Sequence, residues 1–223
     1  MAGLTTERVA ERLAQVRERI TRAGGDPASI TLVAVTKDLG PEAVSTALDN
    51  GLADVGENRA DQLIAKAAGI GRAVRWHYLA RVQRNKVAAL APFVTLWQAV
   101  DRAAAGEEIA RRAPGAAVLV QVNISGEPQK HGARSQEVPA LVEALTAEGL
   151  DVRGVMAVGP TGLAETARPG FRSLVALADR LALPVRSMGM TDDLEVAVQE
   201  GSTMLRIGRG LFGPRPEGRD LRR

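Results

Sequence analysis

The chain has 223 residues, of which 45% are hydrophobic and 25% charged, and its formal net charge is +3 at pH 7. It is long enough for one sizeable core, and it has no apolar run near the roughly 20 residues that a membrane span needs, so one domain and no membrane segment are expected. The absence of cysteine excludes disulfides, thiolate metal sites and a cysteine nucleophile, and it suits a cytoplasmic protein. Aromatic residues make up only 3%, which leaves few platforms for stacked bases, so nucleic acid is not an expected partner.

A helix at about residues 4–24 comes first, and strands and helices alternate after it. Short apolar runs predict strands near residues 31–36, 53–56, 75–79, 94–98, 117–123, 152–157, 185–188 and 203–207. Amphipathic stretches predict helices near residues 41–50, 59–68, 84–91, 101–112, 135–148, 163–182 and 191–200. The glycines at which helices are expected to stop are Gly51, Gly149 and Gly201.

Eight strands separated by helices predict a closed parallel (β/α)8 barrel of the TIM type, to which the N-terminal helix is an addition. We expect one domain over residues 1–223, ending in a basic tail at about 214–223. A doubly wound open sheet is the alternative. In a barrel the active site lies at the carboxyl ends of the strands.

Lys37 stands at such a strand end, in "LVAVTKDLG". Only four of the 29 basic residues are lysines, and lysine is the basic side chain that can lose its proton and attack a carbonyl. The alternative is a lysine that snorkels from the strand end to solvent. For Lys66, in "RADQLIAKAA", a surface role is sufficient.

Mostly small or polar residues lie at or near the ends of the other predicted strands. They include Glu57, Asn58, His77, Asn123, Lys130, Met156, Ser187, Gly189, Arg206 and Gly208. Barrels often bind phosphate with the loops after strands seven and eight, and these loops contain Ser187, Gly189, Gly208 and Arg209; tight turns are the alternative reason for the glycines. Three of the last glycines spell G-x-G-x-x-G, but too little chain follows for the helix and strand of a dinucleotide fold.

A lysine, a phosphate cradle and an arginine that face one cavity suit pyridoxal 5'-phosphate (PLP). This cofactor needs a lysine for its Schiff base, donors for its phosphate and a partner for its ring nitrogen. Arg206 fits the last role. Its guanidinium does not accept a proton, so it would leave the ring nitrogen unprotonated and weaken the ring as an electron sink.

Longer motifs carry a resemblance to a known family. "VAVTK", "VGENR", "WHYLARVQRNK", "VNISGEPQKHG", "RGVMAVGP" and "SMGMTDDLEVAVQEGSTMLRIGRGLFG" resemble the pyridoxal phosphate homeostasis protein family, which is also described as alanine-racemase N-terminal-domain-like, from about residue 30 to 215. The resemblance implies a barrel that holds PLP and a role in PLP homeostasis by a small monomeric protein. The residues that it places at the cofactor are Lys37 as the Schiff-base lysine, Asn58 nearby, Ser187, Gly208 and Arg209 about the phosphate, and Arg206 at the pyridine nitrogen.

Four residues depart from the family pattern. Ala80 and Arg81 replace a Gly-His pair after the third strand, His131 replaces an aromatic residue, and Asp38 follows the predicted Schiff-base lysine. Ala80 puts the local turn in question. A carboxylate at Asp38 would favour the protonated form of Lys37 and slow its reaction.

An amino-acid racemase of the alanine racemase type is the competing function, and a phosphate-substrate barrel enzyme that uses Lys37 without PLP is a third. Such racemases add a C-terminal domain with a catalytic tyrosine, and proton transfer on two faces needs two bases. Tyr78 is the only tyrosine, and we expect it to point toward the helices, while His77 is either a base or a satisfied core residue. We therefore expect a PLP carrier without catalytic turnover, whose partners are PLP and, as further candidates, PLP-dependent enzymes that lack their cofactor.

Overall fold

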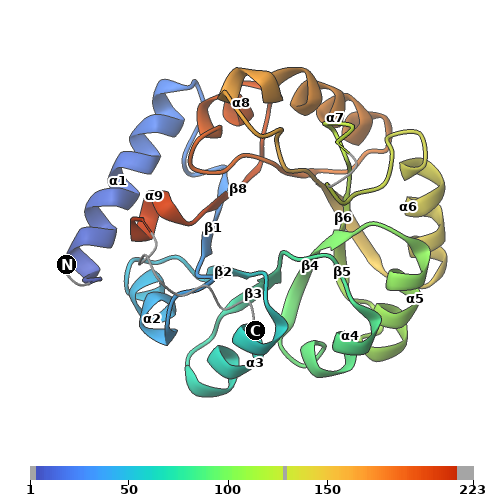
Figure 1. Cartoon of the computed structure of the whole chain (residues 1–223), viewed down its shortest axis with the longest axis horizontal. Helices are drawn as coiled ribbons and strands as arrows, with labels where there is room; N and C mark the ends of the chain where they lie inside the picture. Colours follow the sequence, from blue (N-terminus) through green and yellow to red (C-terminus); the bar gives the residue numbers. More distant parts are fainter. Residues whose placement is uncertain (1–3, 128–129, 215–223) are drawn as a thin grey trace.

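The computed structural model describes residues 4–127 and 130–214, and its strands form a closed parallel barrel in which each strand pairs with the next and β8 pairs with β1 (Figure 1). The predicted (β/α)8 barrel is confirmed, and the open-sheet alternative is wrong. The strands are β1 (Thr31–Val35), β2 (Asp54–Glu57), β3 (Arg75–Tyr78), β4 (Val94–Val100), β5 (Ala117–Gln121), β6 (Asp151–Met156), β7 (Val185–Ser187) and β8 (Met204–Ile207).

Helices surround the barrel on the outside, as the same view shows. They are α1 (Thr6–Arg22), α2 (Pro41–Asp49), α3 (Ala60–Gly69), α4 (Arg84–Leu90), α5 (Ala103–Arg112), α6 (Val138–Ala147), α7 (Arg168–Arg180), α8 (Leu194–Gln199) and α9 (Arg209–Phe212), with a 3-10 turn, η1 (Ala164–Ala167), before α7. The predicted helix at 163–182 is thus divided at Arg168, and α9 was not predicted. Gly51, Gly149 and Gly201 each have a positive φ directly after a helix, which confirms their predicted role.

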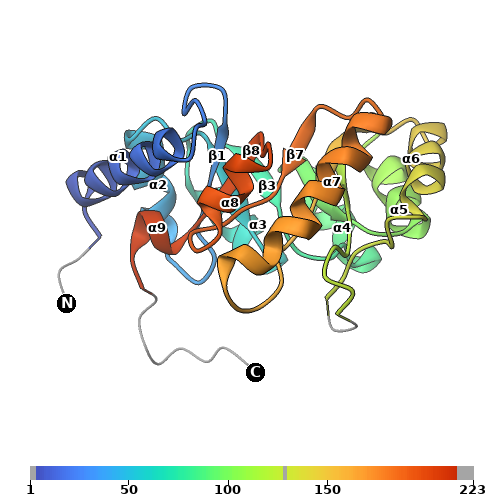
Figure 2. The same ribbon diagram turned by 90° about the horizontal axis from the view of Figure 1, so that it is seen from above.

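Helix α1 takes the place of a long eighth helix. The helix that follows β8, α9, has only four residues, and α1 packs against α2, α8 and α9 at that position (Figures 1 and 2). Its apolar stripe of Val9, Leu13, Val16 and Ile20 is buried there. The N-terminal helix is therefore part of the barrel wall.

Two apolar clusters stabilise the barrel. The larger one lies between strands and helices and contains Tyr78, whose ring contacts Trp97 edge to face at a centroid distance of 5.8 Å. The smaller one fills part of the interior with residues such as Val33, Leu119 and Met156. Tyr78 points toward the helices, as predicted from its place beside His77.

The described residues contain no helix that is long and apolar enough to cross a membrane. The greater part of the predicted basic tail, residues 215–223, lies outside the described residues.

Candidate functional site

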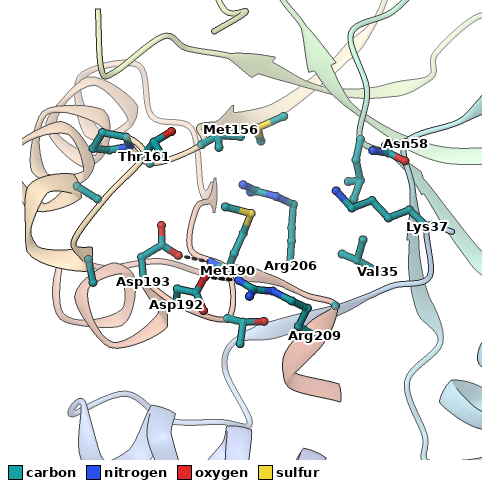
Figure 3. A pocket seen from close by; sticks show the side chains of 18 of the residues that line it. Val35, Lys37, Asn58, Met156, Thr161, Met190, Asp192, Asp193, Arg206 and Arg209 are labelled. Carbon is teal, nitrogen blue, oxygen red and sulfur yellow. Dashed lines mark hydrogen bonds and ion pairs between the residues drawn. The ribbon is translucent and has the colours of Figure 1, made fainter. Parts of the chain in front are cut away.

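A cavity of about 570 Å³ opens at the carboxyl ends of the strands. Its lining comes from the ends of β1, β2, β6, β7 and β8 above all, and Figure 3 shows their side chains around one space. Among the described residues that line the cavity, four have cationic side chains (Lys37, Lys130, Arg206 and Arg209) and two have anionic ones (Asp192 and Asp193). The cavity has the size of a small-molecule site and an excess of positive charge, which favours an anionic ligand.

Lys37 reaches this cavity because of the alternation of β1. Val35 and Lys37 both line the cavity, whereas Thr36 between them points the other way and is fully buried. A tight turn follows, in which Leu39 N donates to Thr36 O at 3.1 Å and Asp38 adopts a left-handed φ of 64°. The chain therefore turns away directly after Lys37, and the side chain extends into the space that Arg206 also faces (Figure 3).

A buried ion pair stands behind this turn. Lys66 Nζ donates to Thr36 O at 2.8 Å and to Glu57 Oε1 at 2.5 Å, and Thr36 Oγ1 donates to the same carboxylate oxygen at 2.7 Å. The predicted surface role of Lys66 is wrong, because its side chain is only 6% exposed. Burial raises the pKa of Glu57, against the opposing effects of Lys66 and Thr36. The pair joins the ends of β1 and β2 on which Lys37 and Asn58 stand.

Asn58 has an unsatisfied atom at the cavity. Its side chain lines the cavity, and its Oδ1 is buried without a hydrogen-bond partner among the described residues. A buried acceptor without a donor costs about 1–3 kcal/mol. A ligand that brings a donor to this atom would recover that cost.

Arg206 projects from β8 into the cavity and is held from behind. Its Nη1 donates to the backbone oxygen and to Oγ of Ser187, and its Nη2 donates to Ala157 O, all at 2.7 Å. Burial lowers the pKa of Arg206 to about 10, and Asp193 opposes this shift. The guanidinium is therefore still cationic at neutral pH, in a fixed orientation.

The loops after β7 and β8 line the cavity with Met190, Thr191, Gly208 and Arg209. They are joined to each other, since Gly210 N donates to Thr191 Oγ1 at 3.0 Å. The backbone approaches closely at Gly208, where a Cβ atom would lie 3.3 Å from Val35 O. These are the loops that the sequence predicted for an anion.

Ser187 lies apart from the cradle that these two loops form with Met190, Thr191, Gly208 and Arg209. It is fully buried and is not among the residues that line the cavity, and its hydroxyl contacts Arg206 instead. Of the six predicted cofactor residues, the structure therefore brings five together at the cavity, and Ser187 stands behind one of them. Gly189, also predicted in this loop, has a φ of 93°, and a Cβ there would lie 2.4 Å from that of Ala197.

An ion pair spans the mouth of the cradle. Arg209 Nη2 donates to Asp192 Oδ2, and both side chains line the cavity and are largely exposed (Figure 3). An anion that binds to Arg209 must compete with this carboxylate.

We therefore expect Asp192→Asn to strengthen the binding of inorganic phosphate roughly twofold to fivefold, the range that an exposed ion pair supplies. A ³¹P NMR titration measures the affinity. Asp151→Asn is a matched control, because it breaks an exposed aspartate–arginine pair, with Arg153, at the other end of a strand. Unchanged or weaker phosphate binding by the Asp192 variant would contradict the competition.

The departures from the family pattern are accommodated locally. Ala80 is not one of the non-glycine residues with positive φ, so its turn needs no glycine, and Arg81 pairs with Asp101 at 2.7 Å. His131 is exposed, and its backbone oxygen accepts from Gln121. His77 is buried, contacts Asp54 Oδ1 at 3.0 Å and does not line the cavity, which favours the satisfied core residue over the base.

The described part of the chain contains no cluster of three or more side chains that could hold a metal ion. The fold and the site together define a (β/α)8-barrel protein with a positively charged cavity of small-molecule size at its strand ends. The family model described as "Alanine racemase, N-terminal domain" matches residues 5–216, and the chain belongs to this family.

Relatives and solved structures agree with this assignment. A protein of Pseudomonas aeruginosa named pyridoxal phosphate homeostasis protein is 37% identical over 221 residues, which cover 95% of this chain and 96% of the relative. The structure of PipY from Synechococcus elongatus with PLP bound matches with a TM-score of 0.80 and 30% identity, over 92% of this chain and 100% of PipY. An alanine racemase of Corynebacterium glutamicum matches with a TM-score of 0.72 but 16% identity, over 96% of this chain and 62% of the racemase, a likeness of fold alone. The family resemblance expected from the motifs is thus confirmed.

Proposed function

We propose that this protein binds PLP at Lys37 and acts in PLP homeostasis, holding the cofactor and supplying or buffering it. The observation that carries the proposal is that Lys37, the buried Arg206 and the joined loops after β7 and β8 face one positively charged cavity. The name of the Pseudomonas relative and the PLP-bound structure of PipY support it.

The residues present fit the cofactor. Lys37 would hold its aldehyde carbon covalently, and Arg206 would face the ring nitrogen with the two guanidinium N–H groups that Ser187 and Ala157 leave over. The phosphate would lie at the loops with Thr191, Gly208 and Arg209 rather than at Ser187, and Asn58 Oδ1 would gain a donor. When bound, the cofactor supplies an aldehyde that condenses with amines and a ring that withdraws electrons from them.

Two features of the chain support a carrier over a racemase. The only tyrosine, Tyr78, is buried in the cluster outside the barrel, so it does not supply an opposing base at the cavity. A cationic guanidinium at the ring nitrogen gives it no proton, which disfavours carbanion chemistry. We further propose a monomer in the cytoplasm whose partners include PLP-dependent enzymes without their cofactor.

The test is to add PLP to the purified protein, record its visible spectrum, reduce with borohydride and map the labelled peptide. We expect a visible band from the bound cofactor and a label on Lys37. The chain has only four lysines, so the assignment is unambiguous. A label on Lys86 or Lys130 would overturn the site, and a colourless protein without any label would overturn PLP binding.

Incubation with L- or D-alanine is expected to give no racemisation at a useful rate. The missing second base alone accounts for a loss of about 10²–10⁴ in rate. Chiral chromatography measures the product while cofactor transfer to an apo-enzyme is followed in parallel. Turnover near one per second (roughly the low end of ordinary enzyme rates) that is lost in Lys37→Ala would restore the racemase.

A further inference from the structure

A row of polar side chains, all but the last of them buried, crosses the interior of the barrel behind Arg206. We define this interior polar chain by its members, in order: Arg206, Ser187, Gln98, His77 and Asp54. They come from five strands, and the step from β7 to β4 crosses the barrel rather than following neighbouring strands. Apart from Arg206, none of them lines the cavity, and the ligand site described above uses none of them directly.

Each link of the interior polar chain has hydrogen-bond length. Arg206 Nη1 lies 2.7 Å from Ser187 Oγ, which lies 2.7 Å from Gln98 Oε1. Gln98 Nε2 lies 2.6 Å from His77 Nδ1, and His77 Nε2 lies 3.0 Å from Asp54 Oδ1. Ser187 and Gln98 are fully buried, and Arg206 and His77 are nearly so. Polar groups this deep in a barrel need partners, and here each finds one in the next.

The donors and acceptors have one consistent direction. Arg206 can only donate, so Ser187 Oγ accepts from it and donates its own proton to Gln98 Oε1. The amide nitrogen of Gln98 also lies 3.2 Å from Met204 Sδ, a weak acceptor, which fixes the orientation of the amide. Gln98 then donates to His77 Nδ1, so the imidazole is assigned its proton on Nε2, which it donates to Asp54.

The far end of the interior polar chain is the Asp54 carboxylate, which is held in its charged form. Burial opposes the charge, but hydrogen bonds from His77 and from Arg75 hold the pKa of Asp54 well below its usual range. Arg75 supplies two of these bonds, from Nε at 2.9 Å and from Nη2 at 2.5 Å. Four donors in succession (Arg206, Ser187, Gln98 and His77) therefore point from the cationic Arg206 toward a fixed anion, and hydrogen bonds in such series polarise one another.

We propose that Ser187, Gln98, His77 and Asp54 are positioning residues for Arg206, which fix its guanidinium and couple it electrostatically to the carboxylate at the opposite end of the barrel. The contact of Arg206 with a bound ring nitrogen is then set from the far side of the interior. This last consequence rests on the proposed function, whereas the coupling itself is a property of the protein without ligand.

The ligand-free test uses histidine ¹⁵N NMR, which is simple because the chain has only two histidines, His77 and His131. We expect His77 in the Nε2–H tautomer. Arg206→Lys keeps the charge but removes the forked donor, so it should shift the His77 Nδ1 resonance by more than the line width. In the Gln98→Leu background the interior polar chain is interrupted. There the same Arg206→Lys change should shift the His77 Nδ1 resonance no further. Equal shifts in both backgrounds, or no shift in either, would overturn the coupling.

The second arm uses the PLP-loaded protein. Gln98→Leu and Ser187→Ala should shift the visible band and weaken PLP binding roughly twofold to tenfold, the worth of one hydrogen bond. Ser187→Ala leaves both backbone acceptors of Arg206 in place, so the fold should persist. The matched control is Gln121→Leu. Gln121 is a buried glutamine on the neighbouring strand β5 that donates to His131 O, and it is not a member of the interior polar chain.

The two arms separate the two ideas. A band and an affinity that change as much in Gln121→Leu as in Gln98→Leu would overturn the positioning role even if PLP binds. Absence of PLP binding in every variant and in the unchanged protein would overturn the proposed function and, with it, the ring-nitrogen consequence, while the ¹⁵N result still decides the coupling to Asp54.

Discussion

Replacing Lys37 with alanine is expected to abolish covalent attachment of PLP completely. The visible band should disappear, and borohydride should label no residue, because no other lysine stands at the end of β1. Non-covalent binding should persist at reduced affinity, since Arg206, Arg209 and the loops after β7 and β8 are unchanged. Equilibrium dialysis and the spectrum of the same sample measure the two effects separately.

Lys130→Ala is the matched comparison, because Lys130 is the second lysine that lines the cavity. Its Nζ donates to Gly159 O at 2.6 Å, so it holds two loops together rather than projecting toward the ligand. We expect this variant to keep the visible band. Loss of the band in Lys130→Ala but not in Lys37→Ala would transfer the covalent role to the other lysine.

Lys66→Met is expected to lower the free energy of unfolding by about 3–5 kcal/mol, because it leaves the buried Glu57 carboxylate without its cation. Urea denaturation followed by circular dichroism measures the loss. Lys86→Met is the control at another helix, α4, where the lysine is exposed and only a small change is expected. Equal losses in the two variants would contradict the structural role of the pair.

The deficit of Lys66→Met should depend on pH. The pKa of Glu57 is raised in the folded protein, so its contribution is most favourable below the ordinary glutamate range and is lost as the pH rises through the raised value. Removing Lys66 raises that pKa further. The deficit relative to the unchanged protein should therefore be smallest in acid and grow toward neutral pH, and the double variant Glu57→Leu/Lys66→Met should recover much of it.

The barrel could be predicted because its signals are local. Apolar runs at strand spacing and glycines at helix ends depend only on neighbouring residues, and Lys37 stood out because a lysine at a strand end is rare in a chain that otherwise uses arginine. The position of Ser187 could not be read in the same way. Residues at the end of β7 alternate between the interior and the loop, and only the register shows that Ser187 lies beneath Arg206 while Thr191 reaches the cavity.

Contacts between residues far apart in the sequence could not be predicted from it, for a physical reason. Glu57 and Lys66 pair across a strand and its following helix, and the signal that could have revealed the pair is the scarcity of lysine, which applies to Lys66 as much as to Lys37. Neighbours in the interior polar chain lie at least 19 positions apart in the sequence, and Gln98 also contacts Met204, 106 positions away. No local sequence pattern encodes such contacts. In the sequence, the residues of the interior polar chain resemble ordinary core or strand residues, and only the closed barrel brings them together.

The position of α1 has a consequence for how the protein is made. Its Arg19 donates to Thr191 O at 2.8 Å and its Arg12 to Leu211 O at 3.4 Å, so α1 binds segments that are synthesised 172 and 199 residues after the contacting arginines. Until α8 and α9 emerge, α1 lacks the greater part of its packing surface, and its apolar stripe is open to chaperones or to neighbouring chains. Closure of the wall thus waits until α8 and α9 have been synthesised, and a ribosome that pauses before β8 prolongs the interval in which the unfinished chain can aggregate.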